Sequence, residues 1–334
     1  MHRAGHILVL GAGSWGTALA THLAAGPARV SLWGRSPAQL EDMARRRENR
    51  RYLPGIHLHE ALHVQPDLDT GLSEADAVLL VTPSDGFSEL LQRMAPALDG
   101  KCLAWACKGF EPGTGRLLHE VARERLGETV PLAVVTGPSF AREVAQGLPT
   151  AMTVACTDET VCRQWAGWLH HGHMRAYTSP DIVGAELGGA VKNVMAIATG
   201  LAEGMGLGHN AQAAIITRGL AEILRLGTPL GALPETLMGL AGLGDLVLTC
   251  TGELSRNRRL GLALGRGESL RQAQAAIGQH VEGVRNAAEV LRLAARVGVE
   301  MPISEQVAAV VQGRCTPAQA LDALITRQPR PELD

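Results

Sequence analysis

Short apolar runs alternate with amphipathic segments through the first half of the chain. Runs that are nearly continuous in apolar residues are typical of strands buried on both faces of a parallel sheet. Six runs have this character: HILVL (6–10), RVSLW (29–33), DAVLLV (76–81), CLAWA (102–106), LAVVT (132–136) and TAMTVAC (150–156). Segments 15–25, 36–47 and 114–126 have the apolar spacing of crossover helices. This alternation predicts an α/β domain with a doubly wound, mainly parallel sheet.

From about Pro180 onward the apolar spacing is almost entirely helical. The predicted helices are 181–203, 208–227, 233–241, 269–277, 283–297, 303–312 and 316–326. Thr316 and Pro317 mark the start of the last one, because threonine caps helices and proline suits the first helical position. We therefore expect an α/β domain over 1–180 and an all-α domain over 181–334.

Composition limits the partners of the chain. Its 334 residues suffice for two domains, with 46% hydrophobic residues, 19% charged residues, 3% aromatic residues and a net charge of −2. Nucleic-acid-binding proteins usually carry a basic excess or aromatic stacking platforms, so a nucleic-acid partner is not expected. No apolar run is expected to span a membrane, and the first apolar run begins too early to leave room for a signal peptide. These features predict a cytoplasmic protein.

The cysteines and histidines do not form a metal-site pattern. The six cysteines lack a CxxC pair: Cys102, Cys107, Cys156, Cys162, Cys250 and Cys315. Free thiols in a reducing compartment are expected. A metal site is one interpretation of His170, His171 and His173, but no carboxylate or cysteine pattern accompanies them. A solvated loop without metal is favoured.

Lysine is rare in this chain. Only Lys101, Lys108 and Lys192 are lysines among 31 basic residues. A coding bias towards arginine explains the rarity, but arginine stays charged whereas a lysine ammonium can give up its proton. The remaining lysines are therefore candidates for chemistry that arginine cannot perform.

A glycine-rich turn follows the first apolar run. Gly11, Gly13 and Gly16 of the GAGSWG segment have GxGxxG spacing and open a predicted helix. Such glycines allow a tight turn, close approach to a pyrophosphate and close helix packing, and the helix N-terminus supplies amide donors. The context predicts a Rossmann-type dinucleotide-binding domain rather than a plain structural turn.

The end of the second apolar run bears on the choice of cofactor. The acidic residue that chelates the adenosine ribose in NAD enzymes is absent from Trp33-Gly34-Arg35-Ser36. Arg35 can stack on adenine or pair with a 2′-phosphate, so NADP is accommodated as well as NAD. The alternative is an ordinary surface arginine.

The carboxyl ends of the apolar runs carry glycines and small polar residues. Parallel strands bring these ends to one edge of the sheet, where ligands bind. The ends are GAGSWG (11–16), GRS (34–36), TPS (82–84), CKG (107–109) and TGPSF (136–140). Lys108 is therefore a ligand-binding candidate, and Ser139 with the amides of a helix start at Phe140 can meet a phosphorylated substrate.

Two charged residues stand in apolar segments of the helical half. Lys192 lies in GGAVKNVMAIATG (188–200) and Asp245 in AGLGDLVLTC (241–250). Burial lowers the pKa of a lysine, which suits proton transfer, and a buried carboxylate needs a cation. We expect the two to pair, the alternative for Lys192 being a side chain that reaches the surface from a core helix.

A third segment has the features of a phosphate site. Ser255 precedes Arg256 and Asn257 at a predicted helix start. A capping serine, free amides and a guanidinium together bind phosphate well. The alternative is a solvated run of charge.

Seven blocks together resemble the bacterial NAD(P)-dependent glycerol-3-phosphate dehydrogenase family over nearly the whole chain. They are GAGSWGTALA, CKGFEPGTG, GPSFAREVAQGLPT, LGGAVKNVMAIATG, AGLGDLVLTC, LSRNRRLG and HVEGVRN. The resemblance implies reduction of dihydroxyacetone phosphate to sn-glycerol 3-phosphate, supplying the glycerophospholipid backbone. It implies NAD or NADP contacts from Ser14, Trp15, Arg35, Lys108, Ala141, Arg256 and Glu282. It implies a substrate held by Lys108, Gly137, Ser139, Lys192, Asp245, Ser255, Arg256 and Asn257.

The resemblance also implies that Lys192 is the general acid/base and that Asp245 orients it, with a homodimer as a class expectation. Cys107 stands where the family often has threonine, and His280 where an aliphatic residue is common. The rival interpretations are a two-domain dehydrogenase acting on a hydroxy acid or acyl-CoA, and a non-catalytic NAD(P) sensor. The SRN segment argues against the first, and Lys192 with Asp245 argues against the second.

Overall fold

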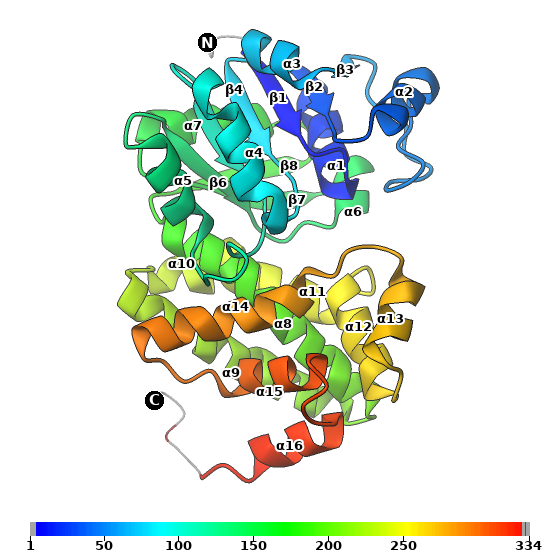
Figure 1. Cartoon of the computed structure of the whole chain (residues 1–334), viewed down its shortest axis with the longest axis vertical. Helices are drawn as coiled ribbons and strands as arrows, with labels where there is room; N and C mark the ends of the chain where they lie inside the picture. The colour runs from blue at the N-terminus through cyan, green and yellow to red at the C-terminus, as the bar shows by residue number, and fades with distance from the viewer. Residues whose placement is uncertain (1–4, 329–330, 332–334) are drawn as a thin grey trace. The chain divides into compact units, whose positions relative to one another are not determined.

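The computed structural model describes residues 5–328 and 331. The chain forms two compact units (Figure 1). The first contains residues 1–107 and 118–185, and the second contains residues 108–117 and 186–334. Segment 108–117 therefore packs with the helical unit, although it follows a strand of the first unit in the chain. The domain boundary at 180/181 stays a prediction.

The first unit is built on one eight-stranded sheet. Its strand order is β3-β2-β1-β4-β5-β6-β7-β8. The strands are β1 (His6–Leu10), β2 (Arg29–Trp33), β3 (Leu62–Val64), β4 (Ala77–Leu80), β5 (Cys102–Trp105), β6 (Leu132–Thr136), β7 (Thr150–Cys156) and β8 (Met174–Ser179). All neighbours pair in parallel except β6 and β7, which are antiparallel. The predicted mainly parallel sheet is confirmed.

Helices cover the sheet, as the crossover connections require. They are α1 (Ser14–Ala24), α2 (Pro37–Arg46), α3 (Leu68–Glu74), α4 (Phe87–Met94), α5 (Leu118–Leu126), α6 (Ala141–Ala145) and α7 (Glu159–Leu169). Helix α1 packs with α6 and α7, whereas α4 packs with α5. Right-handed crossovers on either side of β1 place these two groups on opposite faces of the sheet. The order of strands reverses between β1 and β4, and the glycine-rich turn follows β1 there.

The second unit is helical in all its described elements. Its helices are α8 (Ile182–Gly204, which begins in the first unit), α9 (Gly208–Gly227), α10 (Pro234–Met238), α11 (Asp245–Thr251), α12 (Arg256–Gly265), α13 (Leu270–Ile277), α14 (Glu282–Val297), α15 (Pro302–Val311) and α16 (Pro317–Ile325). The all-α second half expected from the sequence is confirmed.

Helix α8 corrects the expectation that no apolar run is long enough to span a membrane. It has 23 residues and an 18-residue window of mean hydropathy 1.2, so its length and composition would allow it to cross a membrane. However, 94% of that window is buried inside the protein. The apolar residues of α8 therefore form core, and their number reflects a helix that is surrounded by neighbours on all sides.

Candidate functional site

The glycine-rich turn has the geometry that its spacing predicts. Gly11 has a φ of +131°, and a Cβ atom there would lie 2.4 Å from the Val81 carbonyl oxygen. A Cβ atom at Gly16 would lie 1.8 Å from the Gly11 oxygen, so helix α1 can approach the turn only with glycine at this position. At Gly13 a Cβ atom would meet nothing within 4 Å. The first and third glycines thus serve packing, and the second leaves its backbone open to a ligand.

The start of α1 offers free donors beside this turn. Gly13 caps the helix without a side-chain hydrogen bond. The indole Nε1 of Trp15 is buried and has no partner within the described residues. Ser14 Oγ donates to the Tyr52 carbonyl at 2.6 Å. A helix N-terminus with uncapped amides and a spare indole N–H suits the pyrophosphate of a dinucleotide.

Arg35 lies just beyond β2 and is exposed. The arginines of the following helix are engaged elsewhere: Arg45 and Arg46 bond Asp42 at 2.9 and 2.7 Å, and Arg47 donates to backbone carbonyls, including that of His59. No side-chain partner of Arg35 occurs in the described part of the chain. Its guanidinium is therefore available to a ligand at the end of β2.

The end of β6 leads into a short helix. Gly137 is followed by Pro138 and Ser139, whose Oγ donates to the Gly137 carbonyl at 3.0 Å. Phe140 caps α6 without a side-chain bond, and Ala141 is its first residue. The expected helix start at Phe140 is confirmed, while the substrate role of Gly137 and Ser139 and the cofactor role of Ala141 stay predictions.

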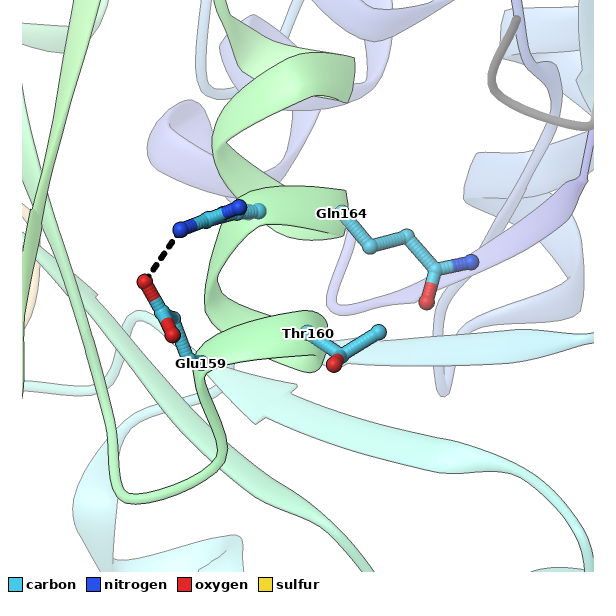
Figure 2. Close-up of a pocket in the computed structure, with 4 residues that line it drawn as sticks. Glu159, Thr160 and Gln164 are labelled. Atoms are coloured by element: carbon cyan, nitrogen blue, oxygen red, sulfur yellow. Dashed lines mark hydrogen bonds and ion pairs between the residues drawn. The ribbon is translucent and has the colours of Figure 1, made fainter.

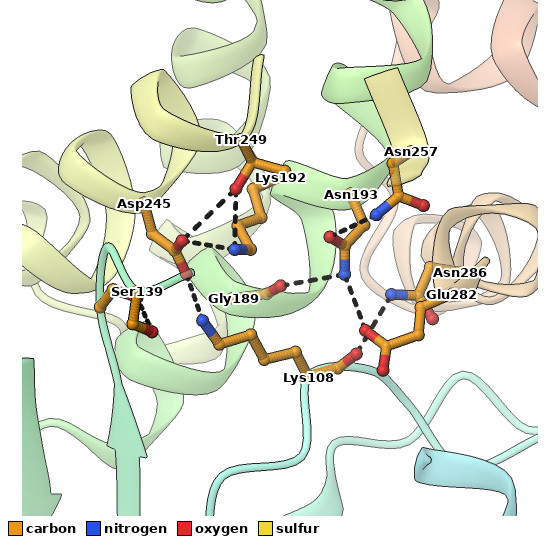
Figure 3. Close-up of polar contacts among 11 residues, drawn as sticks. Lys108, Ser139, Gly189, Lys192, Asn193, Asp245, Thr249, Asn257, Glu282 and Asn286 are labelled. Atoms are coloured by element: carbon orange, nitrogen blue, oxygen red, sulfur yellow. Dashed lines mark hydrogen bonds and ion pairs between the residues drawn. The ribbon is translucent and has the colours of Figure 1, made fainter. Parts of the chain in front are cut away.

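Three charged side chains of the second unit meet directly (Figure 3). Lys192 Nζ forms an ion pair with Asp245 Oδ1, and Lys108 Nζ donates to Asp245 Oδ2 at 2.7 Å. Asp245 is 1% exposed and Lys192 is 6% exposed. The pairing of Lys192 with Asp245 predicted from the sequence is confirmed. Two ammonium groups share one carboxylate, so the cluster carries a net positive charge that favours an anionic substrate.

Burial lowers the pKa of the Lys192 ammonium to about 8. The Asp245 carboxylate raises this pKa and the Lys108 charge lowers it, both to a smaller extent than burial. An ammonium with a pKa near neutrality is a competent proton donor and acceptor. The lowered pKa that we expect from the sequence is therefore confirmed.

Thr249 belongs to this cluster and was missed by the sequence analysis. Its Oγ1 accepts from Lys192 Nζ at 2.9 Å and lies 3.4 Å from Asp245 Oδ1. Asp245 begins α11 directly after a π-helical turn, Leu240–Gly244. Thr249 stands four residues further on, on the same face of the helix. That spacing from Asp245 was the available signal.

An amide network lies next to the lysine pair. Asn257 Nδ2 donates to Asn193 Oδ1 at 2.9 Å, and Asn257 Oδ1 accepts from Gly283 N at 2.9 Å. Asn193 Nδ2 in turn donates to Glu282 Oε2 at 3.3 Å. These bonds connect α12, α8 and α14, so Asn257 and Glu282 have structural partners besides the ligand roles predicted for them. Asn193 was not anticipated.

The start of α12 has the form expected of a phosphate site. Ser255 is the N-cap and its side chain accepts from Arg258 N at 3.2 Å. Arg256 is half-buried, and within the described residues its side chain makes one hydrogen bond, of 3.4 Å from Nη1 to Gln279. The helix start expected at Ser255 is confirmed, and its use for phosphate stays a prediction.

Two surface hollows of the described residues are lined by none of the predicted site residues. One of about 370 Å³ is lined by Glu159, Thr160, Arg163 and Gln164 of α7 (Figure 2). The ion pair of Glu159 and Arg163 that crosses it is exposed. A single helix turn with an exposed ion pair offers no reactive arrangement.

The histidine cluster corrects the expectation of a fully solvated loop. His170, His171 and His173 lie in the loop after α7, but His171 is half-buried whereas His170 and His173 are exposed. Its ring stacks on His22 with centroids 4.0 Å apart, and its buried Nε2 has no partner within the described residues. Burial lowers the pKa of His171 to about 4. The cluster is therefore partly a packing element.

A Rossmann-type unit with an open glycine turn, followed by a helical unit with a buried lysine–aspartate cluster, defines a two-domain nicotinamide-dependent dehydrogenase. Comparisons with known proteins narrow this class. Residues 6–162 match the N-terminal part of NAD-dependent glycerol-3-phosphate dehydrogenase, and residues 181–322 match its C-terminal part. The chain belongs to this family.

Individual relatives agree over nearly the full length. A glycerol-3-phosphate dehydrogenase of Stenotrophomonas maltophilia, named as NAD(P)+-dependent, is 59% identical over 98% of this chain and 96% of the relative. One from Xanthomonas oryzae pv. oryzae is 58% identical with the same coverage. The crystal structure of glycerol-3-phosphate dehydrogenase from Coxiella burnetii has a TM-score of 0.93 at 46% identity, covering 97% of this chain and 99% of that one.

The fold is shared more widely than the family. A D-mandelate dehydrogenase structure has a TM-score of 0.63 at 12% identity, covering 95% of this chain and 99% of that one. Identity this low shows the fold alone. The substrate must therefore be argued from the site residues.

Proposed function

We propose that this protein is an NAD(P)-dependent glycerol-3-phosphate dehydrogenase, which transfers a hydride between NAD(P)H and dihydroxyacetone phosphate to give sn-glycerol 3-phosphate. The observation that carries the proposal is the buried cluster of Lys108, Lys192 and Asp245, in a chain with this family membership. The reaction consumes one proton and is reversible, so the site needs a group that can both give and take a proton.

Lys192 is that group. When bound, the nicotinamide cofactor supplies the hydride that C2 of dihydroxyacetone phosphate receives. The Lys192 ammonium donates its proton to the oxygen on C2 as negative charge develops there. A pKa of about 8 leaves the ammonium mostly protonated near neutral pH, yet ready to release the proton.

Asp245 and Thr249 position this proton donor. The carboxylate holds Lys192 through Oδ1, and the Thr249 hydroxyl accepts from the same ammonium at 2.9 Å. Lys108 occupies the other carboxylate oxygen and adds a second positive charge beside the reacting oxygen. Charge of this kind in a buried site stabilises the developing alkoxide.

The start of α12 is suited to the phosphate of the substrate. Ser255 and Asn257 flank Arg256, and the first amides of the helix are directed out of its N-terminus. Binding at the phosphate would fix the carbonyl carbon relative to Lys192 and lower the entropic cost of reaction. Gly137 and Ser139 of the first unit are proposed to contact the same substrate.

The residues present fit an NAD(P) cofactor. Gly13 leaves open space above the turn and α1 has uncapped amides. The Trp15 indole N–H has no acceptor among the described residues and can donate to a cofactor. Gly11, Gly16, Ser14, Arg35 and Ala141 would contribute from the first unit, and Lys108, Arg256 and Glu282 from the second. The proposal includes a cytoplasmic location, a supply of glycerophospholipid backbones and a homodimeric state.

The direct test is a spectrophotometric assay of the purified protein. Dihydroxyacetone phosphate should cause oxidation of NADH or NADPH, and sn-glycerol 3-phosphate should drive the reverse reaction. A 2-oxo acid and an acyl-CoA serve as controls for the rival dehydrogenases. No turnover of dihydroxyacetone phosphate with either cofactor, in protein that binds cofactor, would contradict the proposal. Turnover of the 2-oxo acid or the acyl-CoA would then favour the rival dehydrogenase, and no turnover of any of them would leave the sensor interpretation.

A further inference from the structure

The loop that carries Lys108 is held by one face of helix α14. Residues 108–117 group with the second unit although they follow β5 in the chain. The loop is closed on itself by a bridge between Phe110 and Leu117 and by a 2.9 Å bond from Glu111 N to the Arg116 carbonyl. Such a loop needs anchors on the helical unit if Lys108 is to keep its place on Asp245.

Glu289 supplies two of these anchors. Its Oε1 accepts from Gly113 N and its Oε2 from Gly115 N, each at 2.9 Å. The side chain is 5% exposed, and Arg292 pairs with Oε1 at 2.5 Å. Gly115 has a φ of +66°, and a Cβ atom there would lie 2.9 Å from Arg292 Cβ and from Leu293 N. The loop backbone therefore lies directly on α14.

Asn286 supplies the third anchor, one turn earlier on the same face of α14. Its Nδ2 donates to the Ala190 carbonyl at 3.0 Å and to the carbonyl of Lys108 itself at 3.5 Å (Figure 3). Ala190 lies two residues before Lys192 on α8. The Asn286 amide thus joins the backbone of Lys108 to the turn of α8 that precedes Lys192, and Asn286 is 1% exposed.

We propose that Asn286 and Glu289 are positioning residues for Lys108: they hold its loop on α14 so that Lys108 Nζ stays on Asp245 Oδ2, opposite Lys192. Neither residue touches the reacting atoms. The inference rests on the proposed function, because it assigns a purpose to the position of Lys108.

The charge of Lys108 gives this role a specific readout. Burial is the main cause of the lowered pKa of Lys192; of the charged groups in the described cluster, Asp245 raises this pKa and Lys108 lowers it. If the loop loosens, Lys108 leaves Asp245 and the pKa of Lys192 rises. The alkaline limb of the kcat profile for dihydroxyacetone phosphate reduction, where Lys192 loses its proton, should then move to higher pH.

The test variant is Glu289→Gln. A carboxamide keeps the size but offers one acceptor oxygen where the loop presents two N–H groups. We expect kcat/KM for dihydroxyacetone phosphate to fall about tenfold or more, since a displacement of about 1 Å in a site can cost 100-fold. The alkaline limb should move up, and amide hydrogen exchange in residues 109–117 should speed up.

The matched control is Glu222→Gln. Glu222 is also a buried carboxyl that accepts from two backbone amides, Ile303 N and Ser304 N, but it holds α15 rather than the loop. This variant should keep the parent KM and pH profile. Asn286→Ala removes the hydrogen bonds from Asn286 Nδ2 to the Lys108 and Ala190 carbonyls. It is the second test variant if Glu289→Gln does not fold.

The outcomes distinguish the proposed function from the positioning role of Asn286 and Glu289. A parent enzyme that does not reduce dihydroxyacetone phosphate contradicts the proposed function, and the exchange rates of residues 109–117 still test the anchors. An active parent whose folded Glu289→Gln or Asn286→Ala variant keeps the pH limb overturns the positioning role, even if activity falls. Unchanged exchange in the loop overturns it as well.

Discussion

The proposed reaction requires a lysine at position 192. Arginine, which supplies most of the basic residues of this chain, cannot replace it. Arginine would keep the positive charge beside Asp245, but its guanidinium does not release a proton near neutral pH. Lys192→Arg should therefore fold and bind cofactor, yet lose about 100-fold or more in kcat, the range of a missing general acid. Steady-state kinetics with dihydroxyacetone phosphate measure the loss.

Lys101→Arg is the control for this exchange. Lys101 Nζ donates to the Ala75 carbonyl at 2.6 Å in the first unit, a bond that arginine can also make. This variant should retain parent activity. Near-normal turnover of Lys192→Arg would remove Lys192 from the mechanism.

Arg256 is expected to bind the substrate phosphate. In the described part of the chain its guanidinium has one bond, of 3.4 Å to Gln279, so it is available for a charge-assisted contact. Arg256→Ala should raise KM for dihydroxyacetone phosphate about 10- to 100-fold, because such bonds contribute about 1.5–3 kcal/mol. Unphosphorylated dihydroxyacetone, a poorer substrate, should be affected far less.

Arg256 is also predicted near the cofactor, so NAD(P)H affinity must be measured in parallel. Equal losses with the phosphorylated and unphosphorylated substrates would mean that Arg256 does not bind the phosphate. In that case the cofactor affinity should carry the whole effect.

Arg35 is expected to permit the use of NADPH. Its exposed guanidinium stands at the end of β2 without a partner in the described residues, while Arg45 and Arg46 are paired with Asp42. Arg35→Asp should lower kcat/KM for NADPH about tenfold or more, since like charges would meet at the 2′-phosphate. NADH should suffer much less.

The control for Arg35 is Arg46→Asp, which makes the same charge change on the following helix. The quantity to compare is the ratio of kcat/KM for NADPH to that for NADH. If Arg35→Asp leaves this ratio at the parent value, Arg35 is a surface residue and cofactor choice is decided elsewhere.

The sequence predicted the charged residues of the site better than its neutral ones. Lys192 and Asp245 are conspicuous because charge within an apolar segment needs a partner, and the two do pair. Thr249 and Asn193 are common residues in helices, and only three-dimensional packing shows which of their hydrogen-bonding groups face the lysines. Glu289 had no signal at all, since its partners are backbone amides of a loop 174 residues away in the chain.

At the level of elements, burial decided which strands were predictable. The six apolar runs became β1, β2, β4, β5, β6 and β7, all in the interior of the sheet. The two missed strands are its edges: β3 has three residues, and only the first of the six residues of β8 is buried. An edge strand needs fewer apolar residues, so its pattern is weak. Helix α7 was also missed, although Asp158 caps it.

Glycine contacts set the distance between α8 and α12. A Cβ atom at Gly261 would lie 2.1 Å from the Ile197 carbonyl oxygen, and one at Gly200 would lie 2.1 Å from the Arg258 oxygen. Gly204 and Gly265 make a similar contact one turn further along each helix. Because the obstacles are backbone atoms, an added methyl group must push the helices apart.

Gly261→Ala should therefore destabilise the second unit by about 3 kcal/mol, at the upper end of typical overpacking costs. It should also lower activity, since α12 carries Ser255, Arg256 and Asn257. Chemical denaturation measures the first effect and substrate KM the second. Gly86→Ala is the control, because a Cβ atom there meets nothing within 4 Å. A stable Gly261→Ala variant would contradict the backbone contact.

At the scale of the whole molecule, the two-unit fold is shared with other dehydrogenases. D-mandelate dehydrogenase has the same fold at low identity, so the sheet and helices do not choose the substrate. The substrate is therefore argued from the side chains that the helical unit presents: two lysines on one carboxylate and an arginine at a helix start. Each unit also contains a titratable group outside the site whose pKa is shifted by burial. The two shifts make the stabilities of the two units depend on pH in opposite directions.

In the first unit the group is His171, whose pKa burial lowers to about 4. The unfolded chain takes up a proton below its ordinary pKa of 6.5, and the folded state does not, so stability is lost as pH falls from about 6.5 to 4. In the second unit the group is Glu222, whose pKa burial raises to about 7 from 4.5. There the folded state holds the proton longer, so stability is lost as pH rises from about 4.5 to 7.

The last prediction follows from these opposite pH dependences of stability. Between pH 4.5 and 6.5 the thermal stability of the first unit should rise with pH through His171, while that of the second unit should fall through Glu222. His171→Phe keeps an aromatic stack on His22 and should reduce the first dependence, to which His6 and His22 still contribute because burial lowers their pKa as well. Glu222→Gln, which cannot ionise, should flatten the second. Hydrogen exchange resolved by residue can follow each unit separately as pH changes. If each variant flattens the pH dependence of both units equally, the two units unfold together and the separate assignment is wrong.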